Sequence, residues 1–82
     1  MEGELTFAHM RQWLARADEL AASGRIDLAK ITRIDSAGAA YLLELKRRAH
    51  KSGRALRLDN PSQQVRGLLE FLRVDGVLKL AS

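Results

Sequence analysis

The sequence of 82 residues contains no cysteine, and none of its hydrophobic runs is long enough to cross a membrane. Without cysteine there is no disulfide framework and no zinc site built on thiolates. A membrane-spanning helix needs roughly 18 or more consecutive apolar residues, so we expect a protein that is not embedded in a membrane. The first ten residues contain acids where a secretion signal would contain a basic patch and an apolar block. We therefore expect a cytoplasmic protein.

Aromatic residues are also few, which bears on the partners of a basic protein. The 14 lysine and arginine residues outnumber the 10 acids, giving a net charge of +4, and a basic cluster lies within residues 46–57. A basic protein raises nucleic acid or an anionic membrane surface as a partner. No aromatic side chain that could stack on bases lies among the clustered basic residues, and no groove-reading motif is present. We therefore expect a solvated basic face and no nucleic-acid partner.

Three segments repeat apolar residues with the period of an α-helix. The first spans residues 10–21, where Thr6 can cap the start and Gly24 suits the left-handed position after the end. The second follows the motif at residues 35–38. The third opens at Asn60, a strong N-cap residue that is followed by the single proline. The side chains that we expect in the core of these helices include Trp13, Leu14, Leu42, Leu45 and Leu68.

Short β-like runs lie between the helices, at residues 26–28, 31–34 and 56–58, and a further run at residues 77–80 closes the chain. Leu5 and Phe7 suggest the tail of another strand. The alternation of strands and helices implies right-handed crossovers and a largely parallel sheet that helices cover. We therefore expect one domain over residues 1–82 with an α/β fold.

The sequence offers no set of residues suited to catalysis. His9 and His50 occupy surface-type positions on different helices, and neither has a histidine four residues away that would complete a zinc pair. Ser36 lacks the Gly-x-Ser-x-Gly setting of a nucleophile elbow, and no glycine-rich phosphate loop is present. Asp27 and Asp35 are expected on different elements rather than as a catalytic pair. We therefore expect no enzyme, no catalytic residue, no cofactor and no metal.

The motif "DSAG" at residues 35–38 is the most informative stretch, because it joins a strand to a helix. The first N–H groups of a helix lack partners within the helix, so an Asp or Ser side chain there acts as a cap. The same place accepts a phosphate. Ser36 is therefore either a cap or a switch, since a phosphate would add a charge of about −1.5 to −2 against a partner surface. Ala37 and Gly38 are small enough to let a partner approach.

Tyr41 and Leu43 flank the core position of Leu42 at about 100° to either side, so both cannot lie at the centre of the core. We expect at least one of them to be partly exposed near the helix start, where it could contact a partner. The candidate partner-binding residues are Asp35, Ser36, Ala37, Gly38, Tyr41 and Leu43.

Four stretches of the chain occur in the order and at the spacing of a known family. They are "GELT" at residues 3–6, "IDL" at 26–28, "IDSAG" at 34–38 with "LLEL" shortly after, and "NPSQQVRGLLEFLRVDGVLKL" at 60–80. In these stretches, which cover nearly the whole chain, the sequence resembles the STAS domain, the fold of bacterial anti-sigma factor antagonists and related modules. The Asp-Ser-x-Gly element is the most specific part of the resemblance.

The resemblance implies a STAS fold, with a small mixed, mostly parallel β-sheet, about three helices packed on it and no catalysis. In the antagonists, a partner anti-sigma factor kinase phosphorylates the serine after the aspartate, and that serine corresponds to Ser36. Another branch of the family is a short free-standing STAS subunit of bacterial phospholipid-transport ABC systems, which maintain lipid asymmetry. That subunit binds the cytoplasmic ATPase, and the corresponding hydroxyl position contributes to the contact.

One departure from the family concerns the start of the chain. Family members usually have a β-strand before the element at residues 3–6, so we expect the first family strand to be missing here. An unprotected sheet edge invites pairing with another chain. This predicts a homodimer through the N-terminal edge of the sheet, and a wrongly chosen start codon is the alternative explanation.

Three functions remain open from the sequence. The first is a non-catalytic STAS subunit that binds the ATPase of a bacterial phospholipid-transport ABC system, which fits a compact, free-standing basic chain. The second is an anti-sigma factor antagonist regulated by phosphorylation of Ser36. The third is an anion- or nucleotide-binding STAS module that uses the helix start at Ser36. All three predict an interface around that serine.

Overall fold

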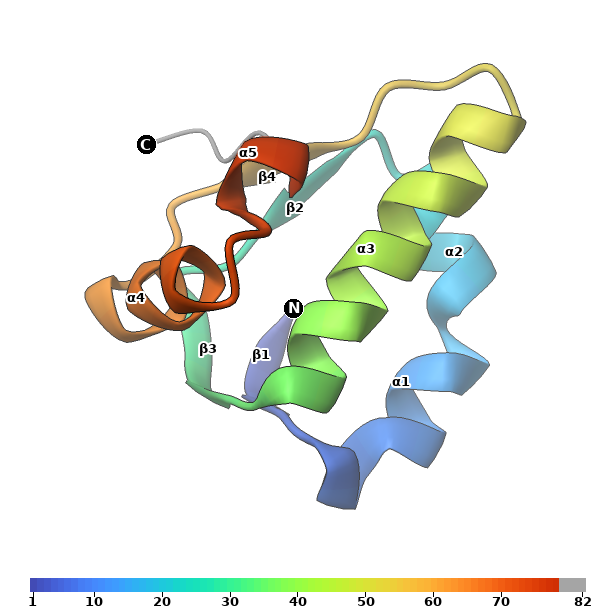
Figure 1. The fold of residues 1–82 in the computed structure, drawn as a ribbon. Coiled ribbons are helices and arrows are strands. Elements are labelled where there is room, and N and C mark those ends of the chain that lie inside the picture. The colour runs from blue at the N-terminus through green and yellow to red at the C-terminus, as the bar shows by residue number, and fades with distance from the viewer. Residues whose placement is uncertain (79–82) are drawn as a thin grey trace.

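Residues 1–78, the part of the chain that the computed structural model describes, form four short strands and a set of helices (Figure 1). The elements are, in order, β1 (Glu2–Leu5), the 3-10 helix η1 (Phe7–His9), α1 (Met10–Ala15), α2 (Ala17–Ala22), β2 (Arg25–Asp27), β3 (Lys30–Ile34), α3 (Ser36–Lys51), β4 (Arg57–Asp59), α4 (Gln63–Phe71) and α5 (Asp75–Leu78). None of the helices within these residues is long and apolar enough to span a bilayer.

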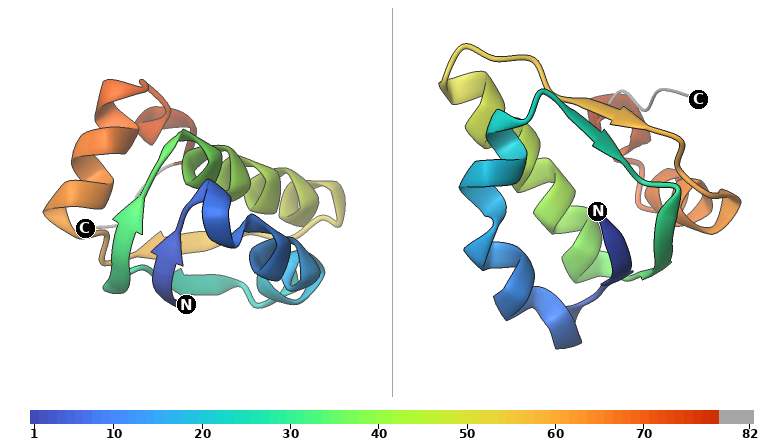
Figure 2. Two further views of the ribbon diagram at one scale, coloured as in Figure 1. Left: turned by 90° about the horizontal axis from the view of Figure 1, so that it is seen from below. Right: turned by 180° about the vertical axis from the view of Figure 1, so that it is seen from behind.

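The strands pair in parallel, β1 with β3 and β2 with β4. The first pairing shifts register between Gly3 and Glu4. In Figures 1 and 2, α1 and α2 run alongside the long helix α3, while α4 lies near β3 at the other side of the molecule. The expected α/β fold with parallel strands and covering helices is therefore confirmed.

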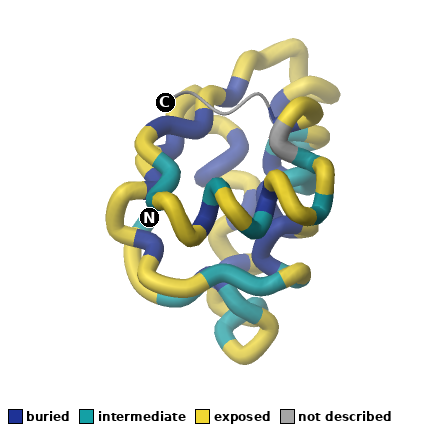
Figure 3. Tube along the Cα trace, turned by 60° about the vertical axis from the view of Figure 1, so that its left-hand side comes forward, coloured by how far each residue is buried: buried dark blue, intermediate teal, exposed yellow. Residues whose placement is uncertain are grey.

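The core lies between α3, its neighbouring helices and the strands. Buried and exposed positions are interspersed along the trace in Figure 3, and buried residues recur along α2, α3 and α4, as expected for helices with one inward face. The side chain of Trp13 ties three elements together, because its indole Nε1 donates to the carbonyl of Glu4 in β1 at 2.8 Å and its ring contacts Tyr41 of α3. The largest fully buried side chains are Leu5, Leu28, Leu42, Leu45, Leu58, Val65, Leu69 and Leu78.

The predicted helix at residues 10–21 is broken at Arg16, whose φ of −105° and ψ of 4° end α1 before α2 begins. This break shifts the apolar stripe between the two short helices. Trp13 and Ala17 are buried, whereas Leu14 is 53% exposed, so the prediction of Leu14 as a core residue was wrong. Gly24 has the predicted left-handed conformation, with φ of 82°. Thr6 does not cap α1: it precedes η1, and its side chain makes no capping bond.

The third predicted helix begins later than expected. Its N-cap is Ser62, whose hydroxyl accepts the N–H of Val65 at 3.2 Å, and not Asn60. Asn60 instead turns the chain after β4 with a φ of 54°, and its amide donates to Asp27 at 3.4 Å. This bond joins the ends of β2 and β4. It occupies Asn60, although asparagine is a preferred N-cap residue. The predicted core residue Leu68 is only half-buried.

The strand predicted at residues 77–80 was wrong for the part that the structure describes, because residues 75–78 form α5. The N–H of Leu78 donates to the carbonyl of Val74 at 2.9 Å, which is a helical bond, and the Leu78 side chain is fully buried. Residues 79 and 80 of that prediction lie outside the described residues. The predicted strand tail at residues 5–7 likewise ends at Leu5, since Phe7 starts η1.

The outer edge of β1 bears on the predicted homodimer. Within residues 1–78, β1 pairs only with β3. The indole of Trp13 occupies the carbonyl of Glu4, which removes one acceptor of β1 from pairing with another chain. Association through this edge stays a prediction.

Gly38 in α3 and Gly67 in α4 have opposite surroundings. A Cβ atom on Gly38 in α3 would lie 2.0 Å from the carbonyl oxygen of Leu5 and 2.8 Å from Cγ1 of Ile34. A Cβ atom on Gly67 in α4 would meet no atom within 4 Å, so Gly67 does not serve close packing. Only the first glycine lets a helix lie directly against a strand.

We expect Gly38→Ala to lower the free energy of unfolding by about 1–3 kcal/mol, because the added methyl group meets the backbone of β1. The matched control, Gly67→Ala, should raise it by about 0.5–1 kcal/mol, because alanine has the higher helix propensity and the site is open. Urea denaturation followed by circular dichroism measures both. Equal stability of the two variants would contradict the close contact between α3 and β1.

Candidate functional site

The carboxylate of Asp35 connects the two segments that meet at the start of α3. Asp35 is the N-cap of α3 and has an extended backbone, with φ of −127° and ψ of −172°. Its Oδ1 accepts the N–H of Gly38 at 2.9 Å, and its Oδ2 accepts the N–H of Phe7 at 3.0 Å. One side chain therefore satisfies a first-turn donor of α3 and the first N–H of η1.

The same hydrogen bonds keep Asp35 ionised. The N–H groups of Phe7 and then Gly38 lower the pKa of this carboxyl below its ordinary value of 3.8, against a smaller opposing effect of burial. A charged carboxylate is therefore fixed at the positive end of the α3 dipole, where an anion is favoured. Any group that binds at this helix start meets this negative charge.

Ser36 is the first residue of α3, next to the cap. It is exposed, and its hydroxyl makes no hydrogen bond with any residue from 1 to 78. Asp35 therefore caps α3, and Ser36 is not the cap. The serine hydroxyl remains free to bond with a partner.

The other predicted site residues divide between surface and core. Ala37 and Leu43 are half-buried, whereas Gly38 and Tyr41 are buried. The Tyr41 hydroxyl donates to the carbonyl of Trp13, and burial raises the pKa of Tyr41 above its ordinary value. Of the pair expected to include one partly exposed residue, Leu43 is the exposed member. Tyr41 is therefore a core residue that packs against α1 and does not face solvent.

Two exposed apolar residues near this site were not predicted from the sequence. Phe7 is 77% exposed, and its backbone is held 3.0 Å from the Asp35 carboxylate. Leu14 is also exposed and lines the same shallow hollow over η1 and α1 as Phe7. The backbone of this exposed phenylalanine and the exposed Ser36 therefore meet at the same junction, at Asp35, which offers a partner both apolar and hydrogen-bonding groups. The sequence held no signal for it, because Phe7 fits a strand pattern equally well.

Within the described part of the chain, the histidines and acids do not gather into a metal site. Nε2 of His9 lies 3.4 Å from Glu4, while His50 is exposed on α3 far along the helix. Asp27 accepts the N–H of Ala29 at 2.9 Å, in a turn separate from Asp35. Across residues 1–78, no three His, Cys, Asp or Glu residues are placed to hold a metal ion.

Replacing Asp35 tests whether this carboxylate stabilises the junction. Asp35→Asn can accept only one of the two N–H groups, so we expect a loss of about 0.5–1.5 kcal/mol at neutral pH. The folded pKa of Asp35 is lowered, so its contribution is present above pH 3.8 and is lost as pH falls through that lowered pKa. The stability difference between wild type and variant should therefore shrink below pH 3.8.

Urea denaturation at a series of pH values measures this difference. The matched control is Ser36→Ala, which changes the adjacent side chain without touching either hydrogen bond. A difference for Asp35→Asn that stays constant down to pH 2 would contradict the role of the charge.

A comparison with models of protein families matches residues 1–80 to the model described as "Mlab, STAS domain". It includes β1, the Asp35–Gly38 junction and the C-terminal helices in a single alignment. No curated protein matches the chain significantly.

Proposed function

The chain belongs to the STAS domain family, and from this premise we propose that it is a docking subunit of a bacterial phospholipid-transport ABC system. Membership in the family supports a regulatory or protein-interaction module. The specific partner, the cytoplasmic ATPase of the transporter, is proposed from the resemblance of the sequence to that branch. In this proposal the surface formed by Phe7, Ser36 and Ala37 meets the ATPase, and no chemical step is catalysed.

The observation that carries the proposal is the exposed hydroxyl of Ser36, which bonds to no residue from 1 to 78, next to the carboxylate of Asp35 that also holds the backbone of the exposed Phe7. Both are held on one rigid support, because Asp35 binds the backbone of each segment. A preformed surface loses little conformational freedom when a partner binds. An aromatic anchor next to a polar contact is also the composition found at interface centres. These features favour a docking surface.

The position of Asp35 favours a contact role for Ser36 over a phosphorylated one. A phosphate on Ser36 would place a charge of about −2 next to a carboxylate that the backbone keeps ionised. The first-turn N–H of Gly38 is already bonded to Asp35 and is not available to the phosphate. The same argument disfavours a free anion or nucleotide at this helix start.

A second candidate function is that of an anti-sigma factor antagonist regulated at Ser36. The exposure of this side chain favours it, because a kinase needs an accessible hydroxyl. In that case the repulsion between the phosphate and Asp35 would be part of the switch. Purification of the protein with its partners from native cells, followed by mass spectrometry, distinguishes the two functions. An ABC ATPase with unmodified Ser36 supports the docking subunit, and a kinase-like anti-sigma factor with phosphorylated Ser36 contradicts it.

Substitutions of Ser36 give opposite results for the two functions. In the docking subunit, Ser36→Ala removes one interfacial hydrogen bond and should weaken ATPase binding by about 0.5–1.5 kcal/mol. In an antagonist, Ser36→Ala should retain binding while Ser36→Asp abolishes it. Isothermal titration calorimetry with the purified partner measures both. Ser52→Ala, which alters an exposed hydroxyl at the opposite end of α3, should leave the affinity unchanged.

Phe7→Ala tests the apolar half of the same surface. Truncating an aromatic anchor at an interface centre commonly costs about 2 kcal/mol or more of binding free energy. Because Phe7 is exposed in the free protein, the substitution should leave the thermal midpoint nearly unchanged. Phe71→Ala, an equally exposed phenylalanine on α4, is the matched control. Equal affinities for the two variants would exclude Phe7 from the interface.

A further inference from the structure

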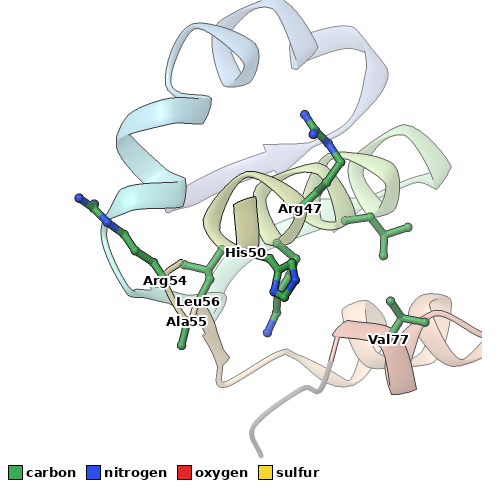
Figure 4. A pocket seen from close by; sticks show the side chains of 8 residues that line it. Arg47, His50, Arg54, Ala55, Leu56 and Val77 are labelled. Atoms are coloured by element: carbon green, nitrogen blue, oxygen red, sulfur yellow. The ribbon is translucent and has the colours of Figure 1, made fainter. Parts of the chain in front are cut away.

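A second hollow lies away from Asp35, between the C-terminal half of α3, the segment that leads into β4, and α5 (Figure 4). It is an open groove with a volume of about 490 Å³. The side chains that line it are Leu43, Lys46, Arg47, His50, Arg54, Ala55, Leu56 and Val77. The proposed function makes no use of this groove beyond Leu43.

The groove has apolar side chains on its two opposite sides. Val77 is 66% exposed on α5 and projects toward α3 in Figure 4. Leu43 is half-buried on α3, and Leu56 is buried beside Ala55 in the segment that leads into β4. Leu78, next to Val77, is fully buried and fixes α5 against the core. An exposed valine on a helix turn that is anchored in this way leaves apolar area that a ligand would cover.

The charged residues that line the groove all have the same sign. Lys46, Arg47 and Arg54 line it together with His50, and none of the described residues that line it is an acid. Arg47 is paired with Glu44 at 2.7 Å, and hydrogen bonds from Arg47 and then Arg48 lower the pKa of Glu44 to about 2. Arg54 also lines the groove, although its guanidinium extends away from Val77 in Figure 4 and its Nη1 donates to the carbonyl of Ala22 in α2 at 3.5 Å. Basic residues therefore border the groove along α3 and in the segment that leads into β4.

We propose that this groove binds an acidic amphipathic segment of a partner protein, as a helix laid between α3 and α5. Apolar side chains of the segment would cover Val77 and Leu43, and its carboxylates would meet Arg54 and the neighbouring basic residues. Laying an amphipathic helix into an apolar groove is a recurring mode of peptide recognition. Complementary charge sets the orientation and the partner.

The shape of the site favours a chain over a membrane surface. The apolar residues lie inside the groove, whereas a bilayer would contact an outward-facing apolar surface. The groove also continues the exposed face of α3: Leu43 follows Ser36 by seven residues, which is about two helical turns on the same side. The inference goes beyond the proposed function, because it holds for whichever protein docks at Ser36.

The test uses the full 82-residue chain and a fluorescent peptide of about 14 residues, with leucines at helical spacing and glutamates on the other face. Fluorescence anisotropy measures its affinity. The same peptide in scrambled order, without an apolar face, is the control for charge alone. We expect the amphipathic peptide to bind, and to bind less tightly as salt is raised.

Two substitutions in the groove should each weaken binding by on the order of tenfold. They are Val77→Glu, which places an acid on the apolar side, and Arg54→Glu, which reverses the charge at the β4 end. Their matched controls are Phe71→Glu and Arg33→Glu, which make the same changes at exposed positions outside the groove. Circular dichroism checks that all four variants are folded.

The outcomes separate this inference from the proposed function and from lipid binding. Ser36→Asp should leave peptide binding unchanged, even where it alters binding of the ATPase. No binding of the peptide, equal binding of the scrambled peptide, or equal loss in groove and control variants would overturn the inference. So would vesicles of phosphatidylglycerol that bind with the same dependence on Val77 and Arg54 while the peptide does not.

Discussion

The hydrogen bonds of the Asp35 carboxylate organise the start of α3, and the candidate site depends on them. One oxygen caps α3 through Gly38, and the other binds the first N–H of η1 through Phe7. This bridge requires α3 and β1 to be close together, which the missing Cβ of Gly38 permits at the carbonyl of Leu5. A charged cap and a glycine contact three residues later therefore fix the same junction. Neither would position the site without the other.

Because the Asp35 carboxylate accepts the backbone N–H groups at this junction, the side chain of the next residue is not needed to cap the helix. Ser36 carries a hydroxyl on a rigid helix start and uses it for no contact within the described part of the chain. The motif thus assigns capping of the helix to Asp35 and leaves Ser36 for contact with a partner, whereas a single capping serine would have to do both. Substitutions at Ser36 can change recognition at small cost to the fold, whereas changes at Asp35 or Gly38 alter the support itself.

The sequence predicted the elements with strong local signals. The inward face of α3, the turn at Gly24, the strand before the motif and the parallel α/β fold all followed from periodicity, turn residues or the family resemblance. The errors arose where two local patterns fit equally well. Four residues of alternation at the C-terminus suit a strand or one helical turn, and Asn60 and Ser62 are both good N-caps. In both cases tertiary contacts decided which of the two structures forms. The exposure of Leu14 has a different cause, which is the break in the helix at Arg16. The apolar half of the site could not be foreseen, because the exposure of Phe7 depends on where β1 ends.

The two ends of α3 differ in electrostatic character, and this difference constrains any protein that contacts both. The helix has 16 residues, a length of about 24 Å. At its start, the carboxylate of Asp35 stands beside a free hydroxyl, whereas its end lies among Arg47, His50 and Arg54. A partner that carries an acid near the start or a base near the end meets like charge at close range. Only one direction of docking along the helix places opposite charges together, so the same residues that bind a partner also fix its orientation.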